Sequence, residues 1–182
     1  SACATCDGFF YKDRVVAVVG GGNTAVEEAL YLSKIAKKVI LIHRRDTLRA
    51  EKILQERLFK LEKEGNVEIK WNHILEEVHG NDSGVQSLSI KNVTDNKIAN
   101  IELEGVFIAI GHVPNTAPFK EILELDENGY LIPDSNSMVK TSIEGVYVAG
   151  DCADHVYRQA ITAAGMGCQA AIEAERWLSE GM

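Results

Sequence analysis

Two cysteines, Cys3 and Cys6, lie near the start of the 182-residue sequence with two residues between them. This spacing allows the sulfurs to meet, so that one thiolate can attack an external disulfide while the other resolves the mixed disulfide. A Cys-x-x-Cys can also be half of a zinc site or an inert pair. The remaining cysteines, Cys152 and Cys168, do not form a second ligand pair at suitable spacing. The pattern therefore predicts a redox-active dithiol and no metal site.

Asp7 directly follows the second cysteine. A carboxylate at this position could exchange a proton with a thiol or a leaving thiolate, or it could cap the local turn, and the sequence favours neither role. One close pair and two scattered cysteines are typical of a reducing compartment, so we expect a cytoplasmic location. We expect the scattered cysteines, Cys152 and Cys168, to be buried as small apolar residues.

A glycine-rich turn follows a short apolar run, in the pattern Gly20-x-Gly22-x-x-Ala25. The first glycine allows a tight turn, the second lets the backbone approach a pyrophosphate, and the small third residue allows helix–strand packing. Asn23 and Thr24 offer an N-cap for a helix whose N-terminus would supply N–H donors to phosphates. The pattern predicts a dinucleotide-binding turn, and the alternative is a glycine-rich turn without a ligand.

Basic residues stand where the second strand is expected to end: His43, Arg44 and Arg45, with Arg49 one turn later. An NAD-binding protein usually has an acidic residue there for the ribose 2′-hydroxyl, whereas guanidinium groups match a phosphate. These residues therefore favour NADPH over NADH. Arg44 and Arg45 point in different directions on an extended chain, so both need not contact the phosphate, and Arg49 could instead cover the adenine. A solvated basic turn is the alternative.

The hydrophobic pattern of the first 112 residues predicts the elements that position these motifs. Short, fully apolar runs are typical of buried strands in a parallel sheet, and apolar residues three or four apart are typical of helices. Short alternating runs separated by turn residues over 74–103 predict an antiparallel meander. The pattern is that of an α/β fold with a Rossmann-like NADPH-binding domain. The expected strands span 15–19, 39–42, 67–71 and 106–110. The expected helices span 50–63 and a segment after the N-cap at 23 or 24, with apolar residues at helical spacing from 25 to 35.

Pro114 marks a domain boundary, because proline forbids helix and restricts the residue before it. We expect an NADPH-binding domain at 1–112, with the dithiol at its start, and the C-terminal portion of a FAD-binding domain at 113–182. Roughly 70 residues are few for an independent core, so we expect this second portion to pack against a further part of the protein. The elements expected there are strands at 130–132 and 146–148 and a helix at 158–178.

Charge and hydropathy argue against two classes of partner, nucleic acid and membrane. The formal net charge of −8 argues against nucleic acid. No apolar run approaches the length of a membrane span, and the sequence does not begin with a signal or transit peptide. It does not begin with Met either, and its first residues already form a motif that could do chemistry. We therefore expect it to begin inside a longer protein.

These motifs, in this order, resemble those of the low-molecular-weight, bacterial-type thioredoxin reductases over essentially the whole chain. The resemblance implies NADPH and FAD as cofactors, thioredoxin as the protein substrate, and an NADPH-binding domain inserted into a FAD-binding domain. Electrons would pass from NADPH through FAD and the Cys3–Cys6 disulfide to thioredoxin. The matching residues are Cys3 to Gly8, Gly20 to Ala25, His43 to Arg45, Arg49, Ala109 to Asn115, Gly150, Asp151, and Arg158 to Ala160.

The resemblance also implies individual roles. Cys6 would be the sulfur nearer the flavin, Cys3 the sulfur that attacks thioredoxin, and Asp7 the acid–base partner. Gly111 would belong to a hinge about which the two domains rotate, and the family is usually a homodimer. FAD would be contacted by Gly150, Asp151, Arg158, Gln159 and Ala160.

Residues near the end of the sequence permit these flavin contacts without requiring them. Asp151 follows an apolar run and could accept a hydrogen bond from a sugar hydroxyl, or it could cap a turn. The last expected helix carries a face of small residues, which permits close approach by a flat cofactor or by another helix. These small residues are Ala160, Ala163, Ala164, Gly165 and Gly167.

One departure from the family concerns the number of glycine fingerprints. A protein that binds two dinucleotides should show two, and this sequence shows one. We therefore expect the N-terminal FAD-binding segment to be missing, and the isolated chain to bind NADPH, hold FAD poorly and be inactive as a reductase, because hydride reaches a disulfide through the flavin. The alternatives are an NADP-binding module, the flavoprotein subunit of alkyl hydroperoxide reductase, which tends to differ between the two cysteines, and a ferredoxin-type NADP reductase, which lacks the dithiol.

Overall fold

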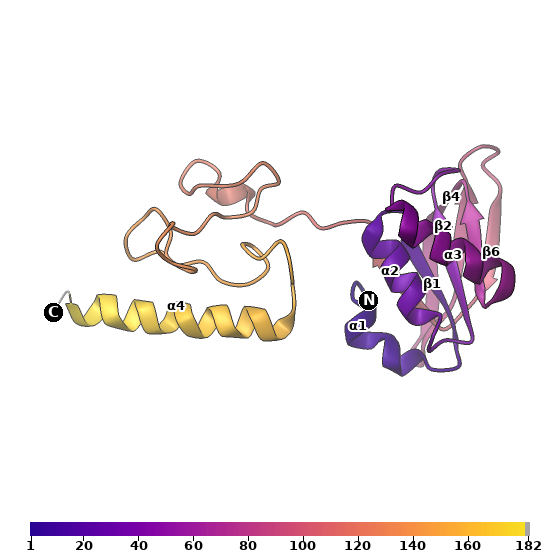
Figure 1. Ribbon diagram of the computed structural model, residues 1–182, viewed down its shortest axis with the longest axis horizontal. Coiled ribbons are helices and arrows are strands. Elements are labelled where there is room, and N and C mark those ends of the chain that lie inside the picture. The colour runs from indigo at the N-terminus through magenta and orange to yellow at the C-terminus, as the bar shows by residue number, and fades with distance from the viewer. Residues whose placement is uncertain (181–182) are drawn as a thin grey trace. The chain divides into compact units, whose positions relative to one another are not determined.

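The computed structural model describes residues 1–180, and the chain divides into two compact units. The first unit is Ser1–Gly111, and the second begins at His112 (Figure 1). No helix in the described part of the chain is long and apolar enough to cross a membrane.

A four-stranded parallel sheet forms the centre of the first unit, in the order β3-β2-β1-β7. The four apolar runs that predicted buried strands all lie in this sheet, as expected for strands covered on both faces. Its register pairs Val19 with Ile42 and Gly20 with Ala109, so the carboxyl ends of the strands meet at one edge. The strands are β1 (Val15–Gly20), β2 (Lys38–His43), β3 (Val67–Trp71) and β7 (Gly105–Ala109).

Two helices, α2 (Asn23–Leu32) and α3 (Lys52–Glu64), cover one face of this sheet (Figure 1). Because side chains alternate along a strand, Val16 and Val18 point to this face and pack with the apolar residues of α2. Leu58 is the fully buried residue of α3. These contacts fix where α2 begins, and therefore where the glycine turn before it lies.

The opposite face of the sheet is covered by a three-stranded antiparallel meander, in the order β4-β5-β6. Ala17 and Ile40 of the parallel sheet pack there against Leu88 and Ile90 of the meander. The meander predicted from alternating residues is thus confirmed, and so is the α/β, Rossmann-like fold class. Its strands are β4 (His73–Asn81), β5 (Gly84–Asn92) and β6 (Ile98–Glu102).

The segment that carries the two cysteines packs on the edge of the parallel sheet formed by β7. It forms α1 (Ala4–Asp7) and η1 (Gly8–Tyr11), two short elements that the hydrophobic pattern does not predict. The Ser1 ammonium donates to the Val106 carbonyl at 2.9 Å, and the Ile108 N–H donates to the Ser1 carbonyl at 2.8 Å. The Tyr11 ring lies edge-on to Phe107, with ring centroids 5.3 Å apart. The dithiol is therefore attached to the same sheet as the glycine turn.

The second unit contains one long helix, α4 (Ala160–Glu180), and one short helix, η2 (Ala117–Phe119), joined by irregular segments. The strands expected at 130–132 and 146–148 are wrong: each segment forms a single bridge, Leu125 with Leu131 and Lys140 with Tyr147. A short apolar run becomes a strand only where a neighbouring segment continues the ladder, and sequence pattern does not report that. None of the residues of α4 is buried within the described chain.

Candidate nucleotide and dithiol sites

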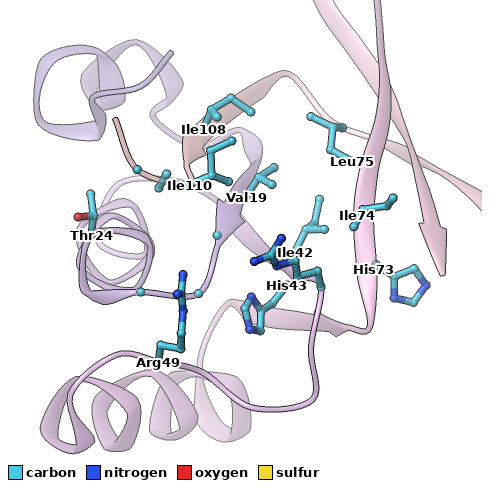
Figure 2. Close-up of a pocket in the computed structure, with 16 residues that line it drawn as sticks. Val19, Thr24, Ile42, His43, Arg49, His73, Ile74, Leu75, Ile108 and Ile110 are labelled. Carbon is cyan, nitrogen blue, oxygen red and sulfur yellow. The ribbon is translucent and has the colours of Figure 1, made fainter. Parts of the chain in front are cut away.

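A cavity of about 610 Å³ lies at the carboxyl ends of the parallel strands (Figure 2). Parallel strands of β-α-β units place their carboxyl ends, and the turns that follow, at one edge, which is where α/β proteins bind ligands. The cavity brings the glycine turn, the basic segment after β2 and the end of β7 together. Its lining is Val19, Gly20, Gly21, Gly22, Thr24, Ile42, His43, Arg44, Arg49, His73, Ile74, Leu75, Ile108, Ala109, Ile110 and Gly111.

Close packing explains the small residues of the glycine turn. A Cβ on Gly20 would overlap the Ala109 carbonyl oxygen and would lie 2.7 Å from the Cβ of Ala25. Ala25 is fully buried, so a larger residue there would separate α2 from the sheet. A Cβ on Gly22 would meet nothing within 4 Å. No neighbouring atom of the described chain thus requires a glycine at position 22, and the open space would allow a pyrophosphate to approach the backbone.

The expected N-cap of α2 is wrong. Gly22 is the N-cap residue, without a side-chain cap hydrogen bond, and Asn23 is the first helical residue. The Asn23 amide turns instead toward Glu51, where its Oδ1 accepts the Glu51 N–H at 2.8 Å. Because no side chain caps this helix, the first N–H groups of α2 stay available to an anion.

Three arginines follow β2, and all three are exposed. Arg44 and Arg49 line the cavity, whereas Arg45 does not. Figure 2 shows the Arg49 side chain extending from the segment before α3 toward the glycine turn. Within residues 1–180, none of the three forms an ion pair with a carboxylate. The cavity thus presents guanidinium groups that no internal anion neutralises.

The His43 ring packs against the backbone of the glycine turn at Gly21. It is 5% exposed, its Nε2 lies 2.9 Å from the Thr47 carbonyl oxygen, and a Cβ on Gly21 would overlap its ring. Its position between Gly21 and Thr47 indicates that it holds two parts of the cavity rim together.

The meander supplies part of the wall that the sequence patterns miss. His73, Ile74 and Leu75, at the start of β4, line the cavity (Figure 2). Since β3 ends beside β2 and β4 begins two residues later, the strand order would have placed these residues at the same edge. With Val19 and Ile108 they make a partly apolar wall of the kind that holds a flat ring.

Cys3 and Cys6 are joined by a disulfide, with Cα atoms 5.3 Å apart. Cys3 is half-buried and caps α1, where its Sγ accepts the Cys6 N–H at 3.2 Å; Cys6 is exposed. Asp7 forms no side-chain cap hydrogen bond, so the turn-capping role is wrong. Phe9 and Phe10 follow with 74% and 71% of their surfaces exposed. No group of three or more candidate metal ligands occurs in the described chain.

The residues that resemble flavin contacts lie in the second unit, whereas Gly111, the residue expected in a cofactor site and in a hinge, ends the first unit and lines the cavity. Gly150 has a φ of +82° and is buried, and the Asp151 side chain beside it is exposed. Gln159 precedes α4, and Ala160 is its first residue. Arg158 precedes the helix with a φ of +48°, so the expected helix start at 158 is wrong.

The scattered cysteines differ from each other. Cys152 is half-buried, and its Sγ lies 3.3 Å from the Ala149 carbonyl oxygen. Cys168 lies on α4 and is exposed in the described chain. The expectation that both are buried is therefore wrong, because α4 has no packing partner among residues 1–180 on that face.

Asp154 organises the segment before α4, a role that the sequence analysis misses. Its carboxylate accepts the N–H groups of Tyr157 at 2.8 Å and of Val156 and Arg158 at 3.0 Å, and the Thr162 hydroxyl at 3.1 Å. The hydrogen bond from Tyr157, with smaller contributions from Arg158, Val156 and Thr162, holds the pKa of Asp154 below its usual value. An aspartate a few residues before a helix start is the signal that could have identified it.

Comparison with known proteins agrees with this arrangement. Residues 1–167 match the family described as pyridine nucleotide-disulphide oxidoreductase. The chain is 61% identical over 181 residues to a thioredoxin reductase of Coxiella burnetii, which covers 98% of this chain and 57% of that protein. It is 56% identical over 182 residues to a protein of Pseudomonas fluorescens named glucosaminate ammonia-lyase, which covers 98% of this chain and 56% of that protein.

Among solved structures, the thioredoxin reductase of Streptococcus pyogenes matches with a TM-score of 0.85 and 40% identity. The match covers 99% of this chain and 57% of that chain. The chain therefore spans a little over half the length of the relatives that it matches.

A Gly22→Ala substitution tests whether the open space at this turn receives a ligand. We expect the free energy of unfolding to fall by about 1 kcal/mol or less, because the new Cβ meets no protein atom. We expect NADP⁺ binding, measured by calorimetry, to weaken about tenfold or more, because the Cβ would stand where the pyrophosphate approaches. Gly21→Ala is the comparison: it should lower stability as well, since its Cβ overlaps His43. Unchanged binding in Gly22→Ala would contradict the site.

The hydrogen bonds of Asp154 give a dependence on pH. Since its folded-state pKa is lowered, the stabilisation is complete above the ordinary aspartate pKa of about 3.9 and is lost as the pH falls below it. We expect the NMR amide signals of Val156, Tyr157 and Arg158 to shift together on acidification, and Asp154→Asn to increase their hydrogen exchange at pH 7. Asp151→Asn, which removes an exposed neighbouring carboxylate, should leave these signals unchanged. A similar response in both variants would assign the effect to net charge.

Proposed function

This chain belongs to the pyridine nucleotide-disulphide oxidoreductase family, and from this premise we propose that it carries the NADPH-binding domain and the dithiol of a thioredoxin-disulfide reductase. One observation carries the proposal. A cavity with unneutralised guanidinium groups and the Cys3–Cys6 disulfide lie in the same compact unit, Ser1–Gly111.

The nucleotide part rests on the fit between the cavity and NADPH. Gly22 leaves space for a pyrophosphate at the uncapped start of α2, and about 610 Å³ is within the range of cofactor cavities. Arg44 and Arg49 lie in the wall without a carboxylate partner among residues 1–180, which suits a dianionic 2′-phosphate better than a ribose hydroxyl. The nicotinamide carrier is therefore NADPH rather than NADH.

The dithiol part rests on the position of Cys3. An N–H directed at Sγ favours the anionic form of a sulfur, so the reduced Cys3 is the better placed nucleophile. The Cys3 thiolate attacks the thioredoxin disulfide, which forms a mixed disulfide and releases one thioredoxin thiolate. The Cys6 thiolate then attacks the Cys3 sulfur, which releases the second thioredoxin thiolate and restores Cys3–Cys6. Two electrons pass to thioredoxin, and Asp7, the residue after Cys6, supplies a proton, which is the role that the family resemblance implies.

A protein substrate suits the surface beside the dithiol. Phe9 and Phe10 are both largely exposed, and their rings meet at a centroid distance of 6.3 Å. Exposed aromatic rings next to a reactive group are typical of a protein-binding surface rather than of a small-molecule pocket. Thioredoxin is the partner that the family resemblance implies for this surface.

The second unit fits part of a flavin site. Asp151 offers an exposed carboxylate beside Gly150, and the first two turns of α4 include small exposed residues, Ala160, Ala164 and Gly165, that a flat cofactor can approach. FAD would accept hydride from NADPH and pass electrons to the disulfide. The residues that would hold it are Gly150, Asp151, Arg158, Gln159 and Ala160.

We propose that the NADPH-binding domain spans residues 1–112 and that the portion of the FAD-binding domain spans 113–182, a boundary one residue beyond the division between the two compact units. Residues 1–182 contain one glycine fingerprint, so this polypeptide by itself is expected to bind NADPH without reductase turnover. A homodimer of the complete protein in the cytoplasm belongs to the same proposal.

The arginines provide the test of the coenzyme. We expect wild-type protein to bind NADP⁺ more tightly than NAD⁺, and Arg44→Ala and Arg49→Ala each to weaken NADP⁺ about tenfold or more, the usual cost of a hydrogen bond to a charged group. Arg45→Ala is the matched control, because Arg45 is exposed but lies outside the cavity wall. Calorimetry with both coenzymes measures this. Equal affinity of the wild type for NADP⁺ and NAD⁺ would refute the coenzyme assignment.

Single-cysteine variants provide the test of the dithiol. In a Cys168→Ser background, which removes the other exposed thiol, Cys6→Ser leaves Cys3 free and Cys3→Ser leaves Cys6 free. The substrate is thioredoxin whose one remaining active-site cysteine is activated with thionitrobenzoate. We expect Cys6→Ser to release thionitrobenzoate about tenfold faster than Cys3→Ser, because the thiolate is the nucleophile. The reverse order would show that Cys6 is the attacking sulfur.

A further inference from the structure

The segment that carries the arginines is tied to the rest of the cavity at several points. This segment, residues 44–51, is called the arginine loop here. Near its start the Arg45 carbonyl accepts the Asn72 N–H at 3.2 Å, and near its end the Arg49 N–H donates to the Gly21 carbonyl at 2.8 Å. The Arg49 backbone is thus bonded directly to the glycine turn.

A reciprocal pair of hydrogen bonds closes the loop against α2. The Glu51 N–H donates to Asn23 Oδ1 at 2.8 Å, and the Asn23 Nδ2 donates to Glu51 Oε1 at 3.2 Å. Asn23 is the first residue of α2, and Glu51 directly precedes α3. The pair therefore connects the phosphate turn with the arginine loop across 28 residues of sequence.

The Glu51 carboxylate is unexpected on charge alone. It lies two residues from Arg49 and beside the glycine turn, which suits a phosphate. Coulomb repulsion from this carboxylate would weaken the binding of an anion at the turn. It also offers an anion that could neutralise a cavity arginine. Asn23 holds the carboxylate instead, and no arginine of the loop is paired with a carboxylate in the described chain. A geometric role explains why an acidic residue is tolerated at this position.

We propose that Glu51 is a positioning residue that fixes the arginine loop against the glycine turn, and that it thereby sets the preference for NADP⁺ over NAD⁺. A loop that is fixed before binding does not lose freedom when its guanidinium groups meet the 2′-phosphate, and binding is tighter for that reason. Glu51 itself does not line the cavity, so its effect passes through Arg49 and Asn23. This inference rests on the proposed nucleotide site.

Two substitutions separate position from charge. Glu51→Ala removes the negative charge and the side-chain bond to Asn23, and leaves the bond from the Glu51 backbone N–H. Glu51→Gln removes the charge and keeps an oxygen that accepts the Asn23 amide. If Glu51 acts by position, Glu51→Ala weakens NADP⁺ about 3- to 10-fold, the cost of one hydrogen bond, and changes NAD⁺ affinity less than twofold. Glu51→Gln should bind NADP⁺ at least as tightly as the wild type. A simple charge effect predicts the opposite sign for Glu51→Ala, tighter NADP⁺ binding.

The measurement is calorimetric titration of the 182-residue chain with NADP⁺ and with NAD⁺, after circular dichroism has shown that each variant is folded. Glu56→Ala is the control, since it removes the same charge from an exposed position of α3. Wild-type discrimination that persists unchanged in Glu51→Ala would overturn this inference alone. A wild type that binds both coenzymes equally would overturn the coenzyme assignment and this inference together.

Discussion

The close approach of three backbone segments at Gly20 is the constraint on which the nucleotide site depends. At that point β1 ends against the Ala109 carbonyl of β7 and against the Cβ of Ala25 in α2, with no space for a side chain. This packing fixes where α2 starts, and hence where its free N–H groups point. The fully buried residues on both faces of β1 hold the strand in place. The phosphate turn is thus rigid because the core beneath it is well packed, and the turn adds little of its own.

A second constraint is electrostatic and acts against the charge of the whole chain. The formal net charge is −8, yet the guanidinium groups of the cavity wall form no ion pair with a carboxylate in the part of the chain that the structure describes. The ion pairs of the described chain lie away from the cavity arginines, for example where Glu68 bridges Lys38 and Lys70 on the sheet. Hydrogen bonds from Lys38 and Lys70 lower the pKa of Glu68, so its carboxylate stays ionised at a lower pH than that of an unpaired glutamate. An overall acidic protein can therefore keep a local positive potential at the one edge where an anionic coenzyme would bind.

Sequence reasoning identified the first unit well and the second poorly, for a physical reason. The strands of the first unit have strong apolar runs because both faces are buried, and β3 matches its expected range of 67–71. Segments 130–132 and 146–148 look similar over three residues, but without a neighbouring ladder they remain single bridges. Motif spacing located Gly22, Arg44 and Arg49, since those positions depend on local geometry. It could not locate Ile74 or the Asn23–Glu51 pair, because they meet the site only through tertiary packing.

The dithiol segment is attached to a strand that also lines the nucleotide cavity. Ser1 is bonded to the Val106 carbonyl and the Ile108 N–H, and Ile108 of β7 also lines the nucleotide cavity. The dithiol segment and the cavity thus share one strand, and the segment could move relative to the cavity only by breaking the Ser1 hydrogen bonds to β7. The division between the units follows Gly111, whose φ of +101° is one that glycine adopts readily and that other residues would adopt only with strain.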